Sequence, residues 1–290
     1  MKESLKIENL TKTYGKSRGV EDINLDIEKG TVYGFIGPNG AGKSTTIKCI
    51  MNLINKNSGN IYIEGNLIGK GNDNVKEKIG YLPSEIHLYD DLKVKDMLMY
   101  SASFYKKDCS SKIKELVKRL EIDISKKVDE LSLGNLKKVG IALALMHDPD
   151  IIIMDEATSG LDPLMQEVFY EILEEEKKNG KTIFFSSHIL SEVKRICDKV
   201  AIIKNGKIVS VEDIDNLSNS TFLKGKVKAQ NVEKIIAELK LKVISENENE
   251  IEFVYSDDIN SLLQVFSRYK IDKLTLEEPS LEEIFIHYYK

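Results

Sequence analysis

The run GPNGAGKST at residues 37–45 constrains this chain more than any other feature of its sequence. Its spacing, a glycine, four residues and then Gly-Lys-Ser, is that of a phosphate-binding P-loop. Glycines leave no Cβ in the way, so successive backbone N–H groups can curl around a phosphate while Lys43 reaches its outer oxygens. The apolar residues 31–36 predict a strand before the loop, and residues 45–53 predict a helix after it. This context indicates a binding site for a nucleoside triphosphate.

We expect the whole loop to contact the nucleotide, and the hydroxyl of Ser44 to bind the accompanying Mg²⁺. The alternative is a coincidental glycine-rich turn, but the flanking strand and helix favour the P-loop. The expected nucleotide-binding residues in this loop are Gly37, Pro38, Asn39, Gly40, Ala41, Gly42, Lys43, Ser44 and Thr45.

Length and composition set further bounds. The 290 residues exceed a typical domain of about 100 to 200, so two domains are expected. A net charge of -5 argues against a protein that binds nucleic acid through its phosphates, because such proteins usually carry a basic surplus. Cys49, Cys109 and Cys197 lie far apart and predict neither a disulfide nor a metal site. No apolar run approaches the ~18 residues of a membrane span, and no signal-peptide core is present, so we expect a soluble chain.

Hydrophobic periodicity divides the chain into regions. Alternating residues at 5–10 and 23–27 predict an N-terminal antiparallel β layer. From about residue 92 apolar residues recur at helical spacing, which predicts a helical lobe inserted at about 85–145. Residues 146–209 then alternate strands with helices, which predicts a mostly parallel sheet covered by helices.

The C-terminal part follows a different pattern. After about residue 219 the predicted order is β-α-β-β-α-β, the split βαβ arrangement of a small, ferredoxin-like α+β domain. We therefore expect two domains, residues 1–217 and 218–290. Ser280 and Glu283 have capping-box spacing, which predicts a last helix beginning at Ser280.

An acidic pair ends the apolar run IIIMDE at residues 151–156. Its four apolar residues predict a strand buried on both faces. Such a strand delivers Asp155 and Glu156 at its carboxyl end, where ligands bind in open α/β sheets. The alternative is a buried strand that ends in a solvated acidic pair.

Four motifs in a fixed order resemble those of the ATP-binding subunit of an ABC transporter: the P-loop, LSLGN at 131–135, IIIMDE, and SGLD at 159–162. The resemblance covers roughly residues 3–215. It implies an α/β fold, a P-loop NTPase of the ABC ATPase type, that binds ATP and Mg²⁺ and hydrolyses ATP. LSLGN departs from the family's LSGGQ motif at Leu133 and Asn135.

The resemblance also implies roles for single residues. Asp155 takes the place of the residue that holds Mg²⁺ through water, and Glu156 that of the residue that orients or deprotonates the attacking water. His188, after the strand TIFFSS, takes the place of a switch histidine against the γ-phosphate; the alternative is a structural histidine at a strand end. Tyr14 takes the place of the aromatic that stacks on adenine; the alternative is an aromatic packed within the sheet.

In this family the signature serine acts on the nucleotide of the opposite subunit. The resemblance assigns that role to Ser132, with Gly134 beside it, and implies a helix over 136–146 whose positive N-terminus points at the phosphate. Two ATP molecules would then be sandwiched in a head-to-tail dimer, either a homodimer or a heterodimer. The implied catalytic set is Lys43, Ser132, Glu156 and His188.

Two departures from the family pattern concern the site. The segment YLPSE places Ser84 where the Q-loop glutamine is usual, and a serine is too short to bridge to the metal as a glutamine amide does. Water or Glu85 is left to substitute. Ala157 replaces the usual proline after Glu156, which we expect to affect backbone stiffness more than chemistry.

The finer pattern, which includes TSGLDPLMQ and SLEEIFIHYY, is similar to subunits of bacterial exporters of the bacitracin and lantibiotic resistance type. That similarity implies a peripheral protein on the cytoplasmic face of the membrane, paired with a separate permease that exports an antibiotic or peptide, with no nucleic-acid partner. One alternative is a non-transport ABC ATPase that clamps or regulates a ribosome or nucleic acid. Another is a regulatory protein whose ATPase has decayed, which Ser84 suggests and intact Lys43, Asp155, Glu156 and His188 oppose.

Overall fold

The computed structural model describes residues 3–15, 17–69, 73–215, 223–239, 241–247 and 249–277. The chain forms two compact units, Met1–Ile214 and Asp215–Lys290, and each is described by itself. The predicted helix at Ser280 lies outside the described residues. All three cysteines are buried free thiols.

The first unit begins with an antiparallel sheet in the order β2-β1-β4-β5. Its two long strands extend well beyond the predicted 5–10 and 23–27, because bulges interrupt the alternation without ending the pairing. At one bulge Asn9 has a φ of 48°, and its side chain donates to Asp22 Oδ1 at 2.8 Å. The strands are β1 (Glu3–Tyr14), β2 (Ser17–Glu28), β4 (Ser58–Ile63) and β5 (Asn66–Leu67).

A six-stranded sheet in the order β10-β9-β3-β8-β7-β6 forms the centre of this unit. All neighbours are parallel except the edge pair β9 and β10. Every residue of β3, β7 and β8 is buried, which explains their continuous apolar sequences. The strands are β3 (Val32–Ile36), β6 (Ile79–Leu82), β7 (Ile151–Asp155), β8 (Thr182–Ser187), β9 (Lys199–Lys204) and β10 (Lys207–Asp213).

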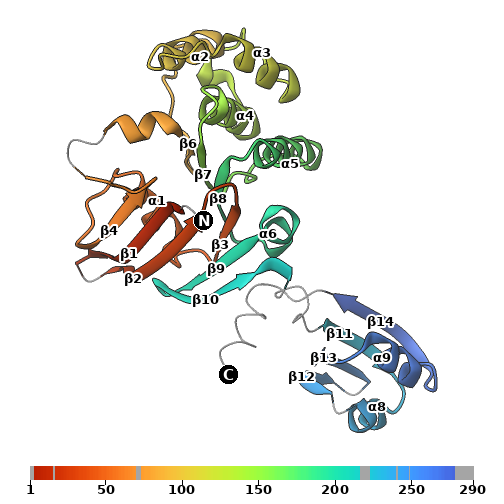
Figure 1. Ribbon diagram of the computed structural model, residues 1–290. Helices are drawn as coiled ribbons and strands as arrows, with labels where there is room; N and C mark the ends of the chain where they lie inside the picture. Colours follow the sequence, from red (N-terminus) through yellow and green to blue (C-terminus); the bar gives the residue numbers. More distant parts are fainter. Residues whose placement is uncertain are drawn as a thin grey trace. The chain divides into compact units, whose positions relative to one another are not determined.

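Helices cover this sheet and form the helical lobe, which in Figure 1 gathers α2, α3 and α4 beyond one end of the strands. Helix α4 packs on β6 as well as on α2 and α3, so it joins the lobe to the sheet. It begins at Leu133 with Ser132 as its N-cap, so the predicted start at residue 136 was wrong. The helices are α1 (Lys43–Ile50), η1 (Asp73–Lys78), α2 (Val94–Ala102), α3 (Ser110–Arg119), η2 (Val128–Glu130), α4 (Leu133–Leu145), α5 (Pro163–Lys178) and α6 (Leu190–Ile196).

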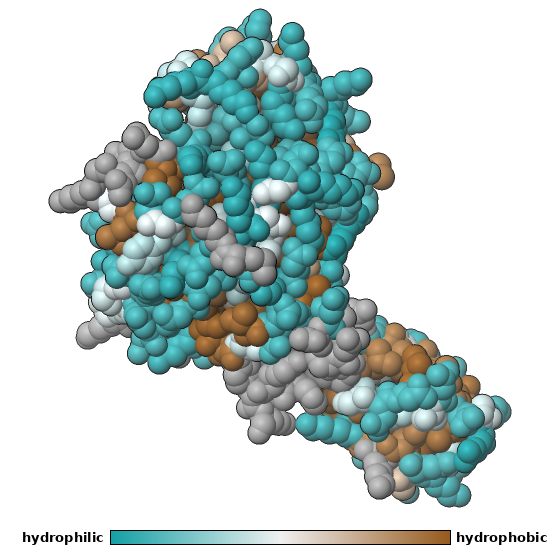
Figure 2. Space-filling view, viewed as in Figure 1, coloured by the Kyte–Doolittle hydropathy of each residue, from teal (hydrophilic) through white to brown (hydrophobic). Residues whose placement is uncertain are grey.

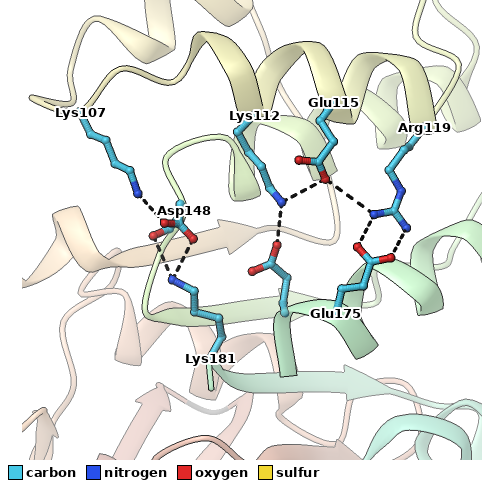
Figure 3. Close-up of polar contacts among 8 residues, drawn as sticks. Lys107, Lys112, Glu115, Arg119, Asp148, Glu175 and Lys181 are labelled. Carbon is cyan, nitrogen blue, oxygen red and sulfur yellow. Dashed lines mark hydrogen bonds and ion pairs between the residues drawn. The ribbon is translucent and has the colours of Figure 1, made fainter. Parts of the chain in front are cut away.

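A chain of ion pairs ties the helical lobe to the core beneath it (Figure 3). Lys112 Nζ on α3 lies 3.2 Å from Glu115 Oε1 and 3.0 Å from Glu176 Oε1 on α5. Arg119, one helical turn beyond Glu115, pairs with Glu175 through both carboxylate oxygens. The remaining pairs meet at the loop after α4 and involve Asp148 with Lys107 and Lys181.

The second unit is a four-stranded antiparallel sheet in the order β12-β13-β11-β14, with two helices that pack together. Its element order is the predicted β-α-β-β-α-β. One sheet face is buried, where the Phe253 ring lies directly over Gly225. The other face carries charged residues such as Lys226. The elements are β11 (Leu223–Ala229), α8 (Val232–Leu239), β12 (Lys242–Asn247), β13 (Glu250–Tyr255), α9 (Ile259–Phe266) and β14 (Ile271–Glu277).

Across the described ranges, no helix has the length and apolar character that crossing a membrane requires. The face of the helical lobe seen in Figure 2 is predominantly hydrophilic.

Candidate functional site

A cleft of about 690 Å³ opens at the carboxyl edge of the parallel sheet. Most of the P-loop lines it, together with the segment after β6, the start of α4 and the end of β7. Its lining includes Asn39, Gly40, Gly42, Lys43, Ser44 and Thr45 from the P-loop, and Ser84, Glu85, Lys137 and Glu156 from elsewhere.

The P-loop backbone has a positive φ at two positions, a conformation that favours glycine. Gly40 has a φ of 77° and Gly42 a φ of 113°. A Cβ at Gly37 would lie 2.3 Å from the carbonyl oxygen of Ile203. Gly42 is also the N-cap of α1, so no side-chain hydrogen bond caps this helix. Its first-turn N–H groups are therefore open to an anion in the cleft.

Lys43 folds back over the loop that carries it. Its side chain is only 4% exposed. Its Nζ donates to the carbonyl oxygens of Gly37 at 2.7 Å and Pro38 at 3.2 Å. The same Nζ lies 3.3 Å from Glu156 Oε1, so the P-loop cation and the acidic strand end meet directly.

The acidic pair at the end of β7 is held by Ser186 of the neighbouring strand. Asp155 is 1% exposed, and its Oδ1 accepts from Ser186 Oγ at 2.6 Å. The Glu156 N–H donates to Ser186 O at 3.1 Å and to its Oγ at 3.2 Å. Glu156 has a φ of 50°, a left-handed conformation that costs about 1–3 kcal/mol in a residue other than glycine. The surrounding hydrogen bonds hold Glu156 in this conformation.

His188 follows β8 and completes the group. Its Nδ1 lies 3.4 Å from Glu156 Oε1, the same oxygen that faces Lys43. Three adjacent parallel strands, β3, β7 and β8, thus bring Lys43, Glu156 and His188 together at one edge of the sheet. A carboxylate between two nitrogen bases or cations can take and release a proton.

The residues predicted to bind Mg²⁺ fit that ion. Asp155 Oδ2 is buried and has no hydrogen-bond partner among the described residues, and the Ser44 hydroxyl belongs to the cleft lining. Both are the hard oxygen donors that Mg²⁺ prefers. The described ranges contain no cluster of three His, Cys, Asp or Glu side chains placed for a metal. Phosphate and water oxygens would complete the coordination, as is usual for Mg²⁺ with a nucleotide.

The two residues of the altered Q-loop also line the cleft. The contact that Ser84 makes here is through its backbone: its carbonyl oxygen accepts a hydrogen bond from Lys137 Nζ at 2.9 Å. The Glu85 side chain is exposed, and its nearest ionic neighbour is His87 at 3.9 Å.

Eight predicted site residues are absent from the described lining of the cleft: Tyr14, Gly37, Pro38, Ala41, Ser132, Gly134, Asp155 and His188. Tyr14 is exposed at the end of β1, with Lys12 Nζ 5.0 Å from its ring centroid, so it is not packed within the sheet. Ser132 is exposed at the start of α4, where its Oγ accepts from the Asn135 N–H at 3.3 Å. Gly134, in the same turn, touches the SGLD segment.

The contact of Gly134 is with Gly160. A Cβ at Gly134 would lie 2.6 Å from the Gly160 carbonyl oxygen, so the two loops meet without any side chain between them. Leu133, which replaces the first glycine of the family motif, is 67% exposed.

Three further residues of the site were not predicted from the sequence. Ser186 is the penultimate residue of the buried strand TIFFSS, where a polar residue could have been noticed. Glu192 on α6 accepts from Thr158 Oγ1 at 2.6 Å and from Ser187 Oγ at 2.5 Å, so it joins the residues beside Glu156 and His188.

Lys137 is the third. It is 2% exposed and donates to the Ser84 and Glu156 carbonyl oxygens, the latter at 3.4 Å. Burial lowers the pKa of Lys137, although the negative charges of Asp155 and Glu156 oppose the shift. No sequence pattern distinguished Lys137 or Glu192 from charged residues on a helix surface.

Comparisons with known proteins agree with this geometry. The family model described as "ABC transporter" matches residues 20–159. A second, "ATP-binding protein DrrA1-3-like, C-terminal domain", matches residues 201–289. The linearmycin resistance ATP-binding protein LnrL of Bacillus subtilis (strain 168) is 33% identical, over 98% of this chain and 97% of its own length. The bacitracin transport ATP-binding protein BcrA of Bacillus licheniformis is 34% identical, over 99% of this chain and 97% of its own.

A solved structure extends the likeness to three dimensions. It is a dimeric ATP-binding cassette in a post-hydrolysis state bound to ADP and Pi, 25% identical to this chain, with a TM-score of 0.66. The match covers 72% of this chain and 98% of the solved chain. Because full-length relatives exceed 30% identity and the nucleotide motifs meet in one cleft, this chain belongs to the ATP-binding subunits of ABC transporters, ATPases whose hydrolysis of ATP is coupled to transport.

Proposed function

We propose that this subunit drives a separate membrane permease that exports an antibiotic or peptide, using ATP hydrolysed by Glu156, His188, Lys43 and a partner's Ser132. The observation that carries the proposal is the meeting of Lys43, Glu156 and His188 at one edge of the parallel sheet. The names of the relatives supply the transported class, since they are bacitracin transport and linearmycin resistance proteins. They do not favour a ribosome or nucleic-acid clamp.

The chemistry needs positioning more than covalent help. Glu156 accepts a proton from a water whose oxygen bonds to the γ-phosphorus, while the bond from that phosphorus to the bridging oxygen breaks to leave ADP and phosphate. Lys43 exchanges its contact with Glu156 for the β and γ oxygens, and His188 contacts the γ-phosphate. Ser44, and Asp155 through water, would hold Mg²⁺, which when bound would supply positive charge to offset that on the phosphate oxygens.

The signature loop, residues 131–135, is proposed to act on the nucleotide of a second subunit. Ser132 is exposed and is not among the described residues that line the cleft of its own chain, which supports a role across an interface. The N-terminus of α4 would add its positive dipole end to the same phosphate. The two subunits would therefore associate head to tail, at the cytoplasmic face of the membrane where ATP is available.

Glu156→Gln tests the assignment of the base. The amide keeps the shape of the side chain and cannot take a proton, so turnover should fall by on the order of 10² to 10⁴ while ATP still binds. The variant should accumulate as an ATP-bound dimer on size exclusion. Hydrolysis at the parent rate would show that Glu156 has another role.

Mixing two inactive variants tests the composite site. Lys43→Ala damages the P-loop and Ser132→Arg blocks the signature loop, so each variant alone has two damaged sites and should be silent. In a mixed dimer one site combines both intact parts, and partial hydrolysis should return. Full activity in Ser132→Arg alone would exclude the head-to-tail arrangement.

Export is tested in cells that lack the native gene. The parent gene should restore tolerance of a bacitracin-type peptide antibiotic, and Glu156→Gln should not. A tagged Glu156→Gln protein should co-purify from detergent-solubilised membranes with a multi-span membrane protein. Co-purification with ribosomes instead would favour the clamp function.

A further inference from the structure

Lys137 occupies an unusual place for a lysine. It lies in the second turn of α4, is almost fully buried and belongs to the lining of the nucleotide cleft. There it donates to the Ser84 carbonyl oxygen at 2.9 Å and to the Glu156 carbonyl oxygen at 3.4 Å. One ammonium therefore joins three segments that are distant in sequence.

Burying an ammonium is unfavourable unless it is hydrogen-bonded and near opposite charge. Lys137 meets both conditions only at this position, between the two carbonyl oxygens and close to the carboxylates of Asp155 and Glu156. A lysine that merely filled space on α4 would direct its amine to solvent, as lysines usually do.

The contact with Glu156 falls on a strained backbone. The N–H of Glu156 is fixed from β8 by Ser186, and its carbonyl oxygen accepts from Lys137 on α4 and from the Ser159 N–H at 3.3 Å. The peptide groups on both sides of the Glu156 Cα are thus held by different elements. Their relative placement determines where the carboxylate points.

We propose that Lys137 is a positioning residue that makes the placement of the Glu156 carboxylate depend on the helical lobe. The inference rests on the proposed role of Glu156 as the base. Helix α4 packs on α2 and α3, so a displacement of the lobe moves the Lys137 ammonium and releases the Glu156 carbonyl oxygen. The same ammonium is hydrogen-bonded to the Ser84 carbonyl oxygen, so the Ser84 segment moves together with Lys137. This contact is made with the backbone and needs no glutamine side chain at residue 84.

Lys137→Met keeps most of the length of the side chain and removes both hydrogen bonds. Because a small misplacement of a catalytic group is costly, kcat should fall about 10-fold to 10²-fold while KM for ATP changes little. Lys137→Arg retains a donor and a charge and should recover much of kcat. Lys138→Met is the matched control, since Lys138 is also buried on α4 and is not among the described residues that line the cleft. Parent kcat in Lys137→Met would overturn the inference, as would equal losses in the Met and Arg variants.

A double-mutant cycle separates this inference from the proposed function. If Lys137 acts through Glu156, Lys137→Met should have no further effect on the residual turnover of Glu156→Gln. Independent, multiplying losses would mean that Lys137 does not act through Glu156. Turnover at the parent rate in Glu156→Gln itself would instead show that Glu156 is not the base. Calorimetric measurement of nucleotide affinity checks that each variant is folded.

Discussion

The parallel sheet of the first unit and the antiparallel sheet of the second unit place their charged residues in opposite ways. The central strands of the parallel sheet are buried on both faces, so their polar groups appear only at the carboxyl ends, where Lys43, Glu156 and His188 meet. The antiparallel sheet of the second unit is buried on one face and carries charges across the other. There Lys226 lies 3.6 Å from Glu250 and 3.4 Å from Glu252, all partly exposed.

This difference determines what a lysine does. Lys43 is 4% exposed beside strained backbone, where water screens its charge little, whereas the Lys226 side chain is 47% exposed. We therefore expect charges at the buried strand ends to serve chemistry, and charges on the open face mainly to keep it solvated.

The largest expected effect comes from the same substitution in both sheets. Lys43→Ala should weaken ATP binding by about 10²-fold or more, because hydrogen bonds to charged groups contribute about 1.5–3 kcal/mol each. Lys226→Ala should leave ATP affinity unchanged and alter stability by less than about 1 kcal/mol. Calorimetric titration with ATP checks both. Equal losses of affinity would break the comparison.

The second prediction concerns the antiparallel sheet alone. A Cβ at Gly225 would lie 2.0 Å from the Phe253 ring, so Gly225→Ala should destabilise the second unit by about 3 kcal/mol through overpacking. Hydrogen exchange in peptides from β11 and β13 should accelerate, while ATP binding stays at the parent level. Gly69→Ala is the control, because no atom lies within 4 Å of its added Cβ. Unchanged exchange would contradict the packing seen here.

The third prediction is that the stability of the first unit depends on pH in a way that the stability of the second unit does not. Burial lowers the pKa of His147 to about 4, and its Nδ1 has no partner among the described residues. In the unfolded chain the pKa of His147 is near 6.5. The folded state, which holds His147 neutral, therefore has its full stability above that pH and loses stability as the pH falls toward 4. Between pH 7 and pH 5 the loss should be about 2 kcal/mol.

His147→Gln should remove much of this acid sensitivity, since an amide can still donate to the Ile79 carbonyl oxygen that His147 Nε2 contacts at 3.2 Å. Urea unfolding at both pH values measures the difference. The described part of the second unit contains no histidine, so its hydrogen exchange should not follow the same pH dependence. An equal acid response in the variant would assign the effect to other groups.

The smallest effect is expected for charges that lie on the surface of the first unit. Arg119→Ala removes the pair with Glu175 between the helical lobe and α5, and should cost less than about 1 kcal/mol. Raising the salt concentration to about 1 M should shrink the difference further, because salt screens exposed pairs. A larger, salt-independent loss in urea unfolding would show that these charges act as buried ones.

Much of the site could be predicted from the sequence because it lies in local patterns. The P-loop, IIIMDE and TIFFSS each combine a buried strand with polar residues at its end, and the structure has β3, β7 and β8 there. Strand lengths in the β layer were underestimated, since the bulge at Asn9 breaks the alternation while pairing continues. The start of α4 was placed too late, because a glycine in a first helical turn suggests a loop.

Lys137 and Glu192 could not be predicted for a different reason. Each is a charged residue within a helix, for which exposure to solvent is the usual outcome. Their burial results from how α4 and α6 pack against strands that are distant in sequence. Only the tertiary structure reveals that they contact the segments beside Glu156 and His188.

The close backbone contact between Gly134 and Gly160 limits which substitutions this sequence can accept during evolution. Leu133 is exposed, and Asn135 uses its backbone N–H toward Ser132, so both positions of the signature loop can vary and both differ from the family motif. Gly134 cannot vary alone, because any side chain would collide with the Gly160 carbonyl oxygen. Gly160, with a φ of 85°, is constrained as well. Descendants of this protein should therefore accumulate changes around these two glycines while keeping both.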